Sequence, residues 1–429
     1  MSDVFAQRRG QLLSRLGEGS LVILRNAPSH LRNGDVHYPY RPDSNFYYLT
    51  GFTEPNAIAV LLQDGSYILF CQPKDALTER WLGPRVDPET ACRQFAANEA
   101  YPISFFSEKL AHYFLNCRRV FCTMGHDLSF DQKILAQLNQ MRAGKRSCVL
   151  PDICHLDPYI NEMRIKKSPE ELVCIERAVA ISCRAHRRAM RACRPGLLEY
   201  QLEAELMHEF YTQGARAIAY ESIVASGKNA CVLHYIQNHS ELKSGELLLI
   251  DAGCEYNYYA SDITRTIPIN GRFTPEQSAL YALVLQTQAE VISLIKPGVA
   301  WDVLRDTAAN CLTSGLVDLG ILRGSVSDLI EQKAYESFYM HGIGHWLGLD
   351  VHDAGDYRVQ NQWRCLEAGM VLTVEPGIYC SEHIPDVPNP YRNMGIRIED
   401  DVLVTATGHR VLSDALPKQI DEIMAVMSS

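Results

Sequence analysis

The sequence predicts an α+β protein with two domains, a smaller α/β domain at residues 1–165 and a larger α+β domain at residues 166–429. The chain has 429 residues, which is too long for one ordinary compact core. Strand and hairpin signals dominate the first part. After residue 165, long capped helices occur in pairs, and each pair leads into strands.

The first domain is predicted to mix helices and strands. Residues 4–16 form a short amphipathic helix, and strands are expected at 20–24, 46–52 and 120–123. Two further strands, one on each side of Asp64-Gly65, form a predicted hairpin at 57–71. None of these segments offers a catalytic constellation.

The second domain contains a repeated pattern. The motif SPEE at 168–171 is a capping box with proline at the first helical position, and its helix ends at RPG, 194–196. A second helix follows, to about residue 214. TPEQ at 274–277 and KPG at 296–298 repeat this framing, again with a following helix. We interpret this as an internal duplication whose halves contribute to one sheet, although capped helix pairs are also common without duplication.

The composition excludes several classes of protein. A net charge of −10 argues against a nucleic-acid partner, because phosphate binding needs a basic face. The N-terminus has no apolar segment of signal-peptide length, and no apolar run is long enough to span a bilayer. The 14 cysteines are scattered and include no C-x-x-C pair. We therefore expect a reduced, cytoplasmic protein without a membrane partner.

Asp251 and Asp262 are the first candidate site residues, at the two ends of DAGCEYNYYASD. A turn centred between Tyr256 and Asn257 would place them directly opposite each other, with Cβ atoms about 4.5–5.5 Å apart. Like charges at that distance are destabilising unless a cation or a shared proton neutralises them. The alternative is a pair of solvated loop aspartates, but the apolar strand leading into Asp251 favours a metal site.

Three histidines, His341, His345 and His352, lie in HGIGHWLGLDVHD. The spacing of the first two would suit a helical metal site, but the glycines between them disfavour a helix. An extended or looped backbone that lines a cleft is therefore expected. Taken alone, the three histidines are as consistent with core residues as with ligands.

Two glutamates complete the set. Glu375 ends the apolar strand of VLTVEPG, and an ionised carboxylate at the end of a buried strand needs a partner. In MGIRIED, the alternation of a strand places Arg397 and Glu399 on one face. By themselves these two residues would more simply form the exposed polar face of a sheet.

No single motif justifies a metal site, but four motifs that supply five ligands in this order do. The ligand set is rich in oxygen and comprises Asp251, Asp262, His345, Glu375 and Glu399. Such a set suits Mn²⁺ better than it suits zinc, which thiolate ligands favour. Two ions about 3.5–4 Å apart can share a hydroxide and bind a tetrahedral intermediate. A neighbouring glutamate can move the proton. The sequence therefore predicts a two-metal hydrolase.

The order of these ligands, together with HGIGHWLGLDVHD, resembles the creatinase/aminopeptidase pita-bread family in its metal-dependent proline-peptidase branch. The segment RPDSNFYYLTGFTEPNAIAVL resembles the amino-terminal domain of Xaa-Pro aminopeptidases, so the resemblance covers nearly the whole chain. It implies a pita-bread catalytic domain. It also implies a metallo-exopeptidase that releases the N-terminal residue before a proline, using two divalent ions, with Mn²⁺ the expected metal.

The resemblance also implies a role for each metal ligand. Asp251 would chelate one metal, and Asp262 and Glu399 would each bridge both metals. His345 and Glu375 would hold the second metal. A hydroxide shared by the metals would attack the scissile carbonyl, and Glu375 would handle its proton.

Four further residues match the family by motif. His234, in NACVLHY, matches a histidine that stabilises the tetrahedral intermediate, and His352 matches one that contacts substrate around the scissile bond. His341 and Arg397 match residues on the leaving-group side of the cleft. The motif around His234 is weaker, so an ordinary surface or core histidine is the alternative there.

Proline selectivity has a physical explanation. An Xaa-Pro bond is a tertiary amide without an N–H, so a site shaped for the ring need offer no acceptor. The family resemblance also implies a homodimer or homotetramer, with the N-terminal domain mediating assembly and restricting access to the cleft. Trp81, in ERWLGPR, is our candidate for a residue that reaches a neighbouring active site.

Four other functions are compatible with parts of this sequence. Xaa-Pro dipeptidase (prolidase) is the nearest, with the same fold and metals, but the RPDSNFYYLTG segment favours the aminopeptidase. A methionyl aminopeptidase is disfavoured by the separate N-terminal domain. A binding module without activity, or a metal-free creatinase-like enzyme, is disfavoured because all five ligands are present.

Overall fold

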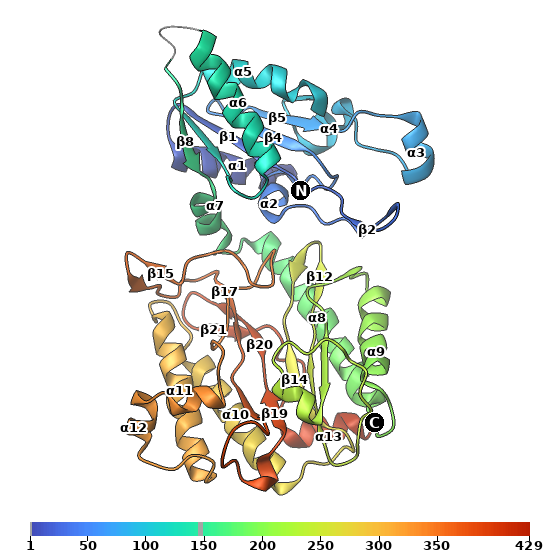
Figure 1. Cartoon of the computed structure of the whole chain (residues 1–429), viewed down its shortest axis with the longest axis vertical. Coiled ribbons are helices and arrows are strands. Elements are labelled where there is room, and N and C mark those ends of the chain that lie inside the picture. The colour runs from blue at the N-terminus through green and yellow to red at the C-terminus, as the bar shows by residue number, and fades with distance from the viewer. Residues whose placement is uncertain (1, 145–148) are drawn as a thin grey trace. The chain divides into compact units, whose positions relative to one another are not determined.

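The computed structural model describes residues 2–144 and 149–429. The chain forms two compact units, Met1–Met163 and Arg164–Ser429, which divide two residues before the predicted boundary (Figure 1). Both units mix helices and strands, as predicted. Each is described separately below.

Unit 1 is built on a six-stranded sheet in the order β6-β5-β4-β1-β7-β8. β1 pairs antiparallel with β4 and parallel with β7, so the sheet is mixed. The strands are β1 (Ser20–Arg25), β4 (Ile58–Leu62), β5 (Tyr67–Cys71), β6 (Glu99–Pro102), β7 (Arg119–Cys122) and β8 (Asp152–His155). The predicted hairpin is confirmed as β4–β5, with Gly65 in the left-handed region at φ 89°.

Helices cover the sheet of unit 1. Phe106 on α5 and Ile134 on α6 pack with sheet residues such as Val60 and Phe70 in one buried core. The helices are α1 (Ser2–Leu16), α2 (Ser44–Thr50), α3 (Ala76–Leu82), α4 (Pro88–Phe95), α5 (Phe106–Leu115), α6 (Leu128–Gly144) and α7 (Asp157–Arg164), with the 3₁₀ turn η1 (Ile103–Phe105). A small hairpin, β2 (Leu31–Asn33) with β3 (Val36–His37), is exposed.

The strand predicted at 46–52 is wrong, because this segment forms helix α2. Its aromatic residues favour a strand, but local caps decide the outcome. The Asp43 side chain accepts a hydrogen bond from the Phe46 N–H at 2.8 Å and so caps the first turn. Gly51 ends the helix at φ 66°, and its N–H donates to the Tyr47 carbonyl.

Unit 2 contains the two predicted helix pairs. α8 (Pro169–Ala192) and α9 (Glu199–Thr212) form the first, and α10 (Pro275–Leu294) and α11 (Trp301–Asp318) form the second. Capping boxes at Ser168 and Thr274 begin α8 and α10, as the sequence predicted. The remaining helices are α12 (Val326–Glu331), α13 (Ile420–Met427) and the 3₁₀ turns η2 (Gly227–Cys231), η3 (Ala334–Ser337) and η4 (Asn389–Tyr391).

The strands of unit 2 lie between the two helix pairs (Figure 1). The first half supplies the sheets β10-β11-β14 and β13-β12-β9, and the second half supplies β17-β20-β21 and β18-β19, beside the small pair β15-β16. The bounds are β9 (Ala217–Ile218), β10 (Ile223–Ser226), β11 (Leu247–Asp251), β12 (Cys254–Tyr256), β13 (Tyr259–Ala260), β14 (Thr264–Pro268), β15 (Arg358–Val359), β16 (Gln362–Trp363), β17 (Val371–Val374), β18 (Gly377–Cys380), β19 (Met394–Arg397), β20 (Asp400–Val404) and β21 (His409–Val411).

The continuous sheet predicted across both halves is therefore interrupted where β14 meets β19. There the Thr266 hydroxyl accepts from the Arg397 N–H at 3.2 Å and donates to the Arg397 carbonyl at 3.0 Å. A side chain thus replaces the backbone ladder at this point. Next to it, a backbone bond runs between the halves, from the Glu399 N–H to the Thr264 carbonyl at 3.1 Å.

The C-terminal tail is held by buried polar groups. The Arg265 guanidinium donates to the Pro417 carbonyl at 3.0 Å and pairs with Asp400 at 2.7 Å. Lys418 pairs with the second oxygen of Asp400 at 2.6 Å. After these residues the chain forms helix α13, in which Ile423 is buried. Among the described helices, none has the length and apolar character needed to cross a lipid bilayer.

Candidate active site

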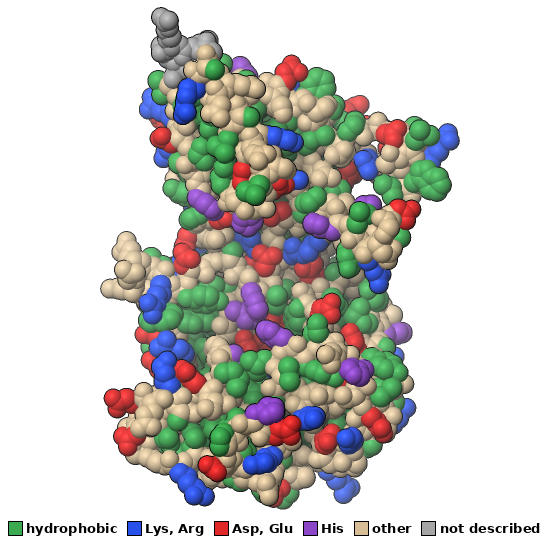
Figure 2. Space-filling model, in the orientation of Figure 1, with side chains coloured by type: hydrophobic (Ala, Val, Ile, Leu, Met, Phe, Trp, Pro, Cys, Tyr) green, Lys and Arg blue, Asp and Glu red, His purple; other side chains and the backbone are tan. Residues whose placement is uncertain are grey.

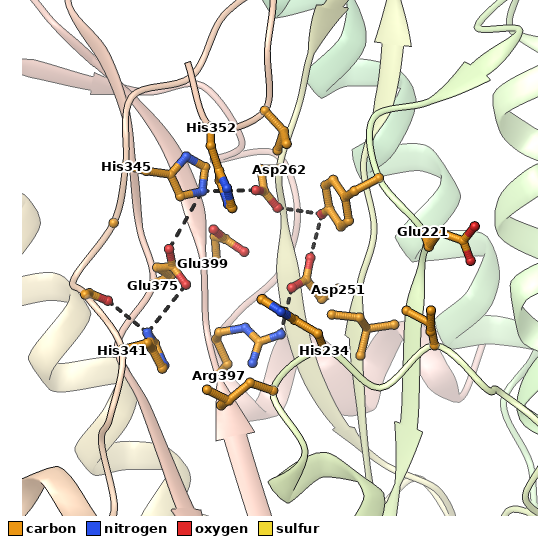
Figure 3. Close-up of a pocket in the computed structure, with 17 residues that line it drawn as sticks. Glu221, His234, Asp251, Asp262, His341, His345, His352, Glu375, Arg397 and Glu399 are labelled. Carbon is orange, nitrogen blue, oxygen red and sulfur yellow. Dashed lines mark hydrogen bonds and ion pairs between the residues drawn. The ribbon is translucent and has the colours of Figure 1, made fainter. Parts of the chain in front are cut away.

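The site lies in a cavity of about 490 Å³ in unit 2. Histidine and acidic side chains gather on this face of the unit (Figure 2), and the close-up shows them converging from both halves (Figure 3). All nine residues predicted for the site line the cavity: His234, Asp251, Asp262, His341, His345, His352, Glu375, Arg397 and Glu399. Segments more than 160 residues apart in the chain thus meet here.

Asp251 and Asp262 are close together, but the register predicted for them is wrong. Asp251, at the end of β11, pairs with Thr264 rather than with Asp262. The turn is centred on Asn257 and Tyr258, both with positive φ, one residue later than predicted. Because side chains on a strand alternate, Asp262 faces the same side as Thr264, which keeps the two carboxylates together.

Gly253 lies between the two aspartates at a very close backbone approach. A Cβ atom at this position would lie 1.8 Å from the Ser261 carbonyl oxygen. Only glycine therefore fits between Asp251 and the returning chain. The Ser261 N–H completes the contact by donating to the Cys254 carbonyl.

Tyr220 joins the two aspartates. Its hydroxyl lies within hydrogen-bond distance of one oxygen of Asp251 and one oxygen of Asp262. A hydroxyl carries one proton, so it donates to one carboxylate at a time. This tyrosine was not predicted from the sequence, because nothing in its local pattern distinguishes it from a core aromatic.

The segment that carries the three histidines is not helical and lines the cavity, as predicted, and its part from Ile343 to Leu347 lies beside β17. The Thr373 N–H donates to the His345 carbonyl, and the Glu375 N–H donates to the Ile343 carbonyl, both at 2.9 Å. A Cβ at Gly344 would lie 2.0 Å from the Thr373 carbonyl oxygen, so glycine permits this approach. The strand β17 thereby fixes His345 and Glu375 on neighbouring backbones.

The His345 ring is oriented by the backbone. Its Nδ1 lies 3.0 Å from the Trp346 carbonyl, a contact that places the proton on Nδ1 and directs Nε2 into the site. Nε2 lies 3.3 Å from an oxygen of Asp262 and 3.8 Å from Glu375. The His352 ring packs edge-on against His345, with centroids 4.3 Å apart.

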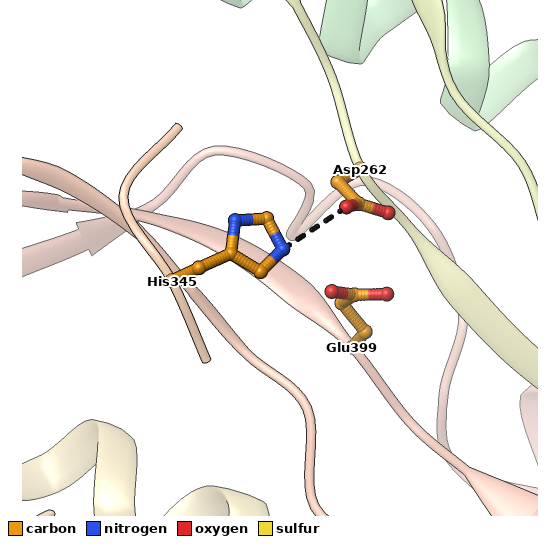
Figure 4. Close-up of side chains that lie close together, drawn as sticks. All are labelled: Asp262, His345 and Glu399. Carbon is orange, nitrogen blue, oxygen red and sulfur yellow. Dashed lines mark ion pairs between the residues drawn. The ribbon is translucent and has the colours of Figure 1, made fainter. Parts of the chain in front are cut away.

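The ligand atoms of Asp262, His345 and Glu399 lie within 4.8 Å of one another (Figure 4). Glu399 is 1% exposed, and one of its oxygens accepts from the Thr264 hydroxyl at 2.7 Å. The Asp262 N–H donates to the buried Asp401 carboxylate at 3.1 Å. The candidate metal ligands Glu399 and Asp262 are thus themselves held by hydrogen bonds from neighbouring residues, as ligands in metal sites generally are.

Arg397 and His341 meet at a second tyrosine that the sequence did not reveal. The Tyr379 hydroxyl lies 2.8 Å from His341 Nε2 and accepts from Arg397 Nη1 at 2.8 Å. The other terminal nitrogen of Arg397 pairs with Asp251 at 2.7 Å. Arg397 therefore faces the acidic cluster rather than solvent, so the exposed polar face considered from the sequence is excluded.

The chain alone does not balance the charges of this site. Burial raises the pKa of Glu375 to about 7, although His345 and Arg397 act in the opposite direction. Burial and the neighbouring Asp262 raise the pKa of Glu399 well above its ordinary value. Burial disfavours a charged His345, but Asp262 outweighs it and raises the pKa of the ring to about 9. The cluster therefore takes up protons that a bound cation would displace.

These residues fit divalent cations. Four carboxylates and one imidazole Nε2 converge on one buried region, and oxygen and imidazole ligands suit Mn²⁺ and related ions. Repulsion among the crowded carboxylates destabilises the protein without metal, and bound cations would neutralise that repulsion.

Comparisons with known proteins agree with this geometry. The model of "Metallopeptidase family M24" matches residues 173–406, and that of "Aminopeptidase P, N-terminal domain" matches residues 5–121. The chain belongs to metallopeptidase family M24. As a member of M24 with the aminopeptidase P N-terminal domain, it is a metallo-exopeptidase with the pita-bread fold.

Similar proteins span the whole length of this M24 enzyme. It is 43% identical to the Xaa-Pro aminopeptidase of Haemophilus influenzae, over 99% of this chain and 97% of the relative. A solved structure of aminopeptidase PepP from Pseudomonas aeruginosa is 45% identical and superposes with a TM-score of 0.97, covering 100% of this chain and 98% of the other. A zinc-substituted Escherichia coli aminopeptidase P in complex with product is 42% identical, with a TM-score of 0.97 and coverage of 100% and 98%.

Proposed function

We propose that this enzyme is an Xaa-Pro aminopeptidase that hydrolyses the bond between an N-terminal residue and a following proline, with two divalent cations at the site. The observation that carries the proposal is the convergence of four carboxylates and the His345 ring in one cavity, in a chain with both aminopeptidase P domains. Mn²⁺ is the proposed metal.

Five residues would hold the cations. Asp251 would hold one, His345 and Glu375 the other, and Asp262 and Glu399 would bridge both. Bound divalent cations supply a nucleophile from water at neutral pH and polarise the scissile carbonyl. The role of the protein is to fix these ligands at or near the ends of strands and, for His345, beside β17.

The proton transfers belong to Glu375. Its carboxyl lines the cavity beside the other proposed ligands, within reach of a water-derived nucleophile, where a carboxylate can take up a proton and return it. His341 Nδ1 lies 3.7 Å from this carboxyl. Burial lowers the pKa of His341 to about 3, so the ring stays neutral and the proton remains with Glu375.

Substrate contacts come from the cavity walls. His234 would stabilise the tetrahedral intermediate, His352 would contact the substrate around the scissile bond, and His341 with Arg397 would lie on the leaving-group side. Four apolar side chains line the same cavity: Ile223, Leu233, Ile236 and Val351. They offer a surface for the proline ring, which brings no N–H that needs an acceptor. The free α-amine would be received by the acidic residues and a metal.

The test is peptide cleavage by metal-stripped protein with and without added Mn²⁺, followed by mass spectrometry. We expect Mn²⁺-dependent loss of only the first residue from Xaa-Pro-Ala peptides. Turnover of Xaa-Pro dipeptides but not of longer peptides would make the enzyme a prolidase instead. Cleavage that persists after complete metal removal would exclude the metal-dependent mechanism.

His234→Ala is expected to keep its metal but to lower kcat by about 100-fold, because it removes a contact made mainly in the transition state. Metal content by atomic emission and kcat on an Xaa-Pro-Ala peptide would measure the two effects. The matched control is His239→Ala, an exposed histidine of the same segment that does not line the cavity. Loss of metal from His234→Ala would show that the role assigned to His234 is wrong.

We also propose a homo-oligomer that assembles through unit 1 and a cytoplasmic location. Helix α3 carries exposed apolar side chains, with Trp81 at 87% exposure and Leu77 at 67%. Exposed apolar side chains grouped in this way mark interaction surfaces.

Trp81→Ala is expected to weaken assembly or to raise the KM for tripeptides, because Trp81 is proposed to reach a neighbouring active site. Light scattering and tripeptide kinetics would measure both, with the exposed Val149→Ala as a control of unit 1 outside this patch. Unchanged assembly and unchanged kinetics would remove Trp81 from the proposal.

A further inference from the structure

Glu199 is a completely buried carboxylate in the first turn of α9, and the mechanism above does not use it. Its Oε1 accepts hydrogen bonds from the Ser226 N–H and hydroxyl, both at 2.7 Å, and from Asn229 Nδ2 at 3.0 Å. Its Oε2 accepts from the Tyr235 hydroxyl at 2.8 Å and from the Ser240 N–H at 2.9 Å. One side chain thus satisfies five donors.

These donors belong to a single segment, which begins at the end of β10 and runs to Ser240. His234 lies near its middle and lines the catalytic cavity. Ser226 and Ser240, at the two ends of the segment, bind different oxygens of the same carboxylate. The carboxylate therefore sets how the two ends approach each other, and so where the chain between them runs.

The position of His234 depends on this backbone. Within residues 2–144 and 149–429, the structure gives the His234 ring no hydrogen-bond partner. Its neighbour Tyr235 is 8% exposed and packs with Leu249 and Tyr379, while its hydroxyl is bound to Glu199. Because Glu199 fixes Tyr235, it also restricts the backbone position of the adjacent His234.

The segment also rests directly on the strand that carries Arg397. A Cβ at Gly395 in β19 would lie 2.2 Å from the Ala230 carbonyl oxygen, so η2 touches this backbone. One side of the segment is therefore fixed by β19 and the other by Glu199. A small change at either contact would displace the residues between them.

We propose that Glu199 is a positioning residue that holds His234 at the catalytic cavity. The inference rests on the proposed role of His234. A carboxylate is needed because it only accepts hydrogen bonds. Glutamine would keep the shape, but its amide NH₂ would face donors and leave at least two of them without an acceptor.

The test is a double-mutant cycle with Glu199→Gln, His234→Ala and the double variant in the Mn²⁺-loaded enzyme. We expect Glu199→Gln to lower kcat by about tenfold or more with unchanged metal content, because a displaced catalytic group loses rate without losing the metal ligands. In the His234→Ala background the same substitution should change kcat by less than about twofold, since the group it positions is absent.

The control is Glu203→Gln, one turn further along α9. Glu203 is half-buried and accepts from Asn238 Nδ2 at 3.0 Å, and Asn238 also donates to the Ser222 carbonyl at 2.8 Å. Its loss leaves Asn238 bound, so kcat should stay within about twofold of the wild-type value. If Glu199→Gln does not fold, Tyr235→Phe removes one of the five bonds and should lower kcat about threefold, again only when His234 is present.

Three outcomes would overturn the inference while the proposed function stands. The first is a wild-type kcat for Glu199→Gln, or for Tyr235→Phe where that variant replaces it. The second is a loss of metal from the same variant. The third is an effect of the substitution on kcat that is equally large with and without His234. A wild-type kcat for His234→Ala is a different result, because it would remove the role proposed for His234 and the inference with it.

Discussion

Replacing Asp262 by asparagine is expected to abolish metal binding and to lower activity by at least about a thousandfold, because it removes the carboxylate that we propose as a bridge between two cations. In the structure, one oxygen of Asp262 lies beside Tyr220 and the other lies 3.3 Å from His345 Nε2. Asparagine offers one oxygen and one NH₂, and an NH₂ cannot bind a cation. Glu399→Gln should behave in the same way.

Thermal unfolding separates loss of metal from loss of fold. Mn²⁺ should raise the Tm of the wild-type protein, because a ligand that binds only the native state stabilises it. It should not raise the Tm of Asp262→Asn. In metal-free buffer the Tm of the variant should stay close to that of the wild type, because the substitution relieves repulsion of Glu399 by Asp262 but also removes the pairing of Asp262 with His345.

The matched control is Glu221→Gln, since Glu221 is exposed at the edge of the cavity and points away from the cluster (Figure 3). It should keep its metal and its Mn²⁺-dependent rise in Tm. An Asp262→Asn variant that still binds two ions per chain would contradict the bridging role. A variant that melts far below the wild type in metal-free buffer would show instead that Asp262 is needed for folding.

The helix pairs and the nine candidate residues could be predicted because their signals are local. Capping boxes lie within four residues of sequence, and each candidate residue stands in a short motif whose order resembles a known family. The two tyrosines could not be predicted in this way. Tyr220 is 31 residues from Asp251 and Tyr379 is 38 residues from His341, so only the tertiary structure brings them into contact.

Two errors show where local patterns compete. Residues 46–52 have the composition of a strand, but in the structure Asp43 caps a helix and Gly51 ends it, and these local contacts outweigh the strand preference. The register between Asp251 and Asp262 was set by a turn at Asn257 and Tyr258, and tyrosine is an unusual residue at positive φ. Gly253 fixes that register, through a backbone contact that no sequence pattern shows.

The second large effect is expected on stability, from Asp353→Ala behind the histidine segment. The Asp353 side chain is 1% exposed and pairs with Lys167, also 1% exposed, at 2.8 Å and with Arg164 at 2.5 Å. It also accepts from the Asp350 N–H at 3.3 Å. Its removal leaves the Lys167 ammonium buried without this carboxylate, which should lower the free energy of unfolding by about 3–5 kcal/mol.

The effect should depend on pH in a defined direction. Burial favours the protonated carboxyl, but Lys167 and Arg164 outweigh it, so the pKa of Asp353 lies below its ordinary value of 3.8. The stabilisation is therefore present above about pH 4 and is lost as the pH falls through the lowered pKa. The difference between wild type and variant should be constant near neutral pH and should shrink in strong acid.

Urea denaturation of metal-free protein would measure this, with Glu367→Ala as the matched control. Glu367 pairs with Lys166, the neighbour of Lys167, but both side chains are about half exposed, at 49% and 51%. An exposed pair contributes less than about 1 kcal/mol, because water solvates both charges when the pair is broken. Equal losses in the two variants would contradict the role of burial. A much larger loss for Asp353→Ala would show that burial makes this ion pair important for the stability of the fold.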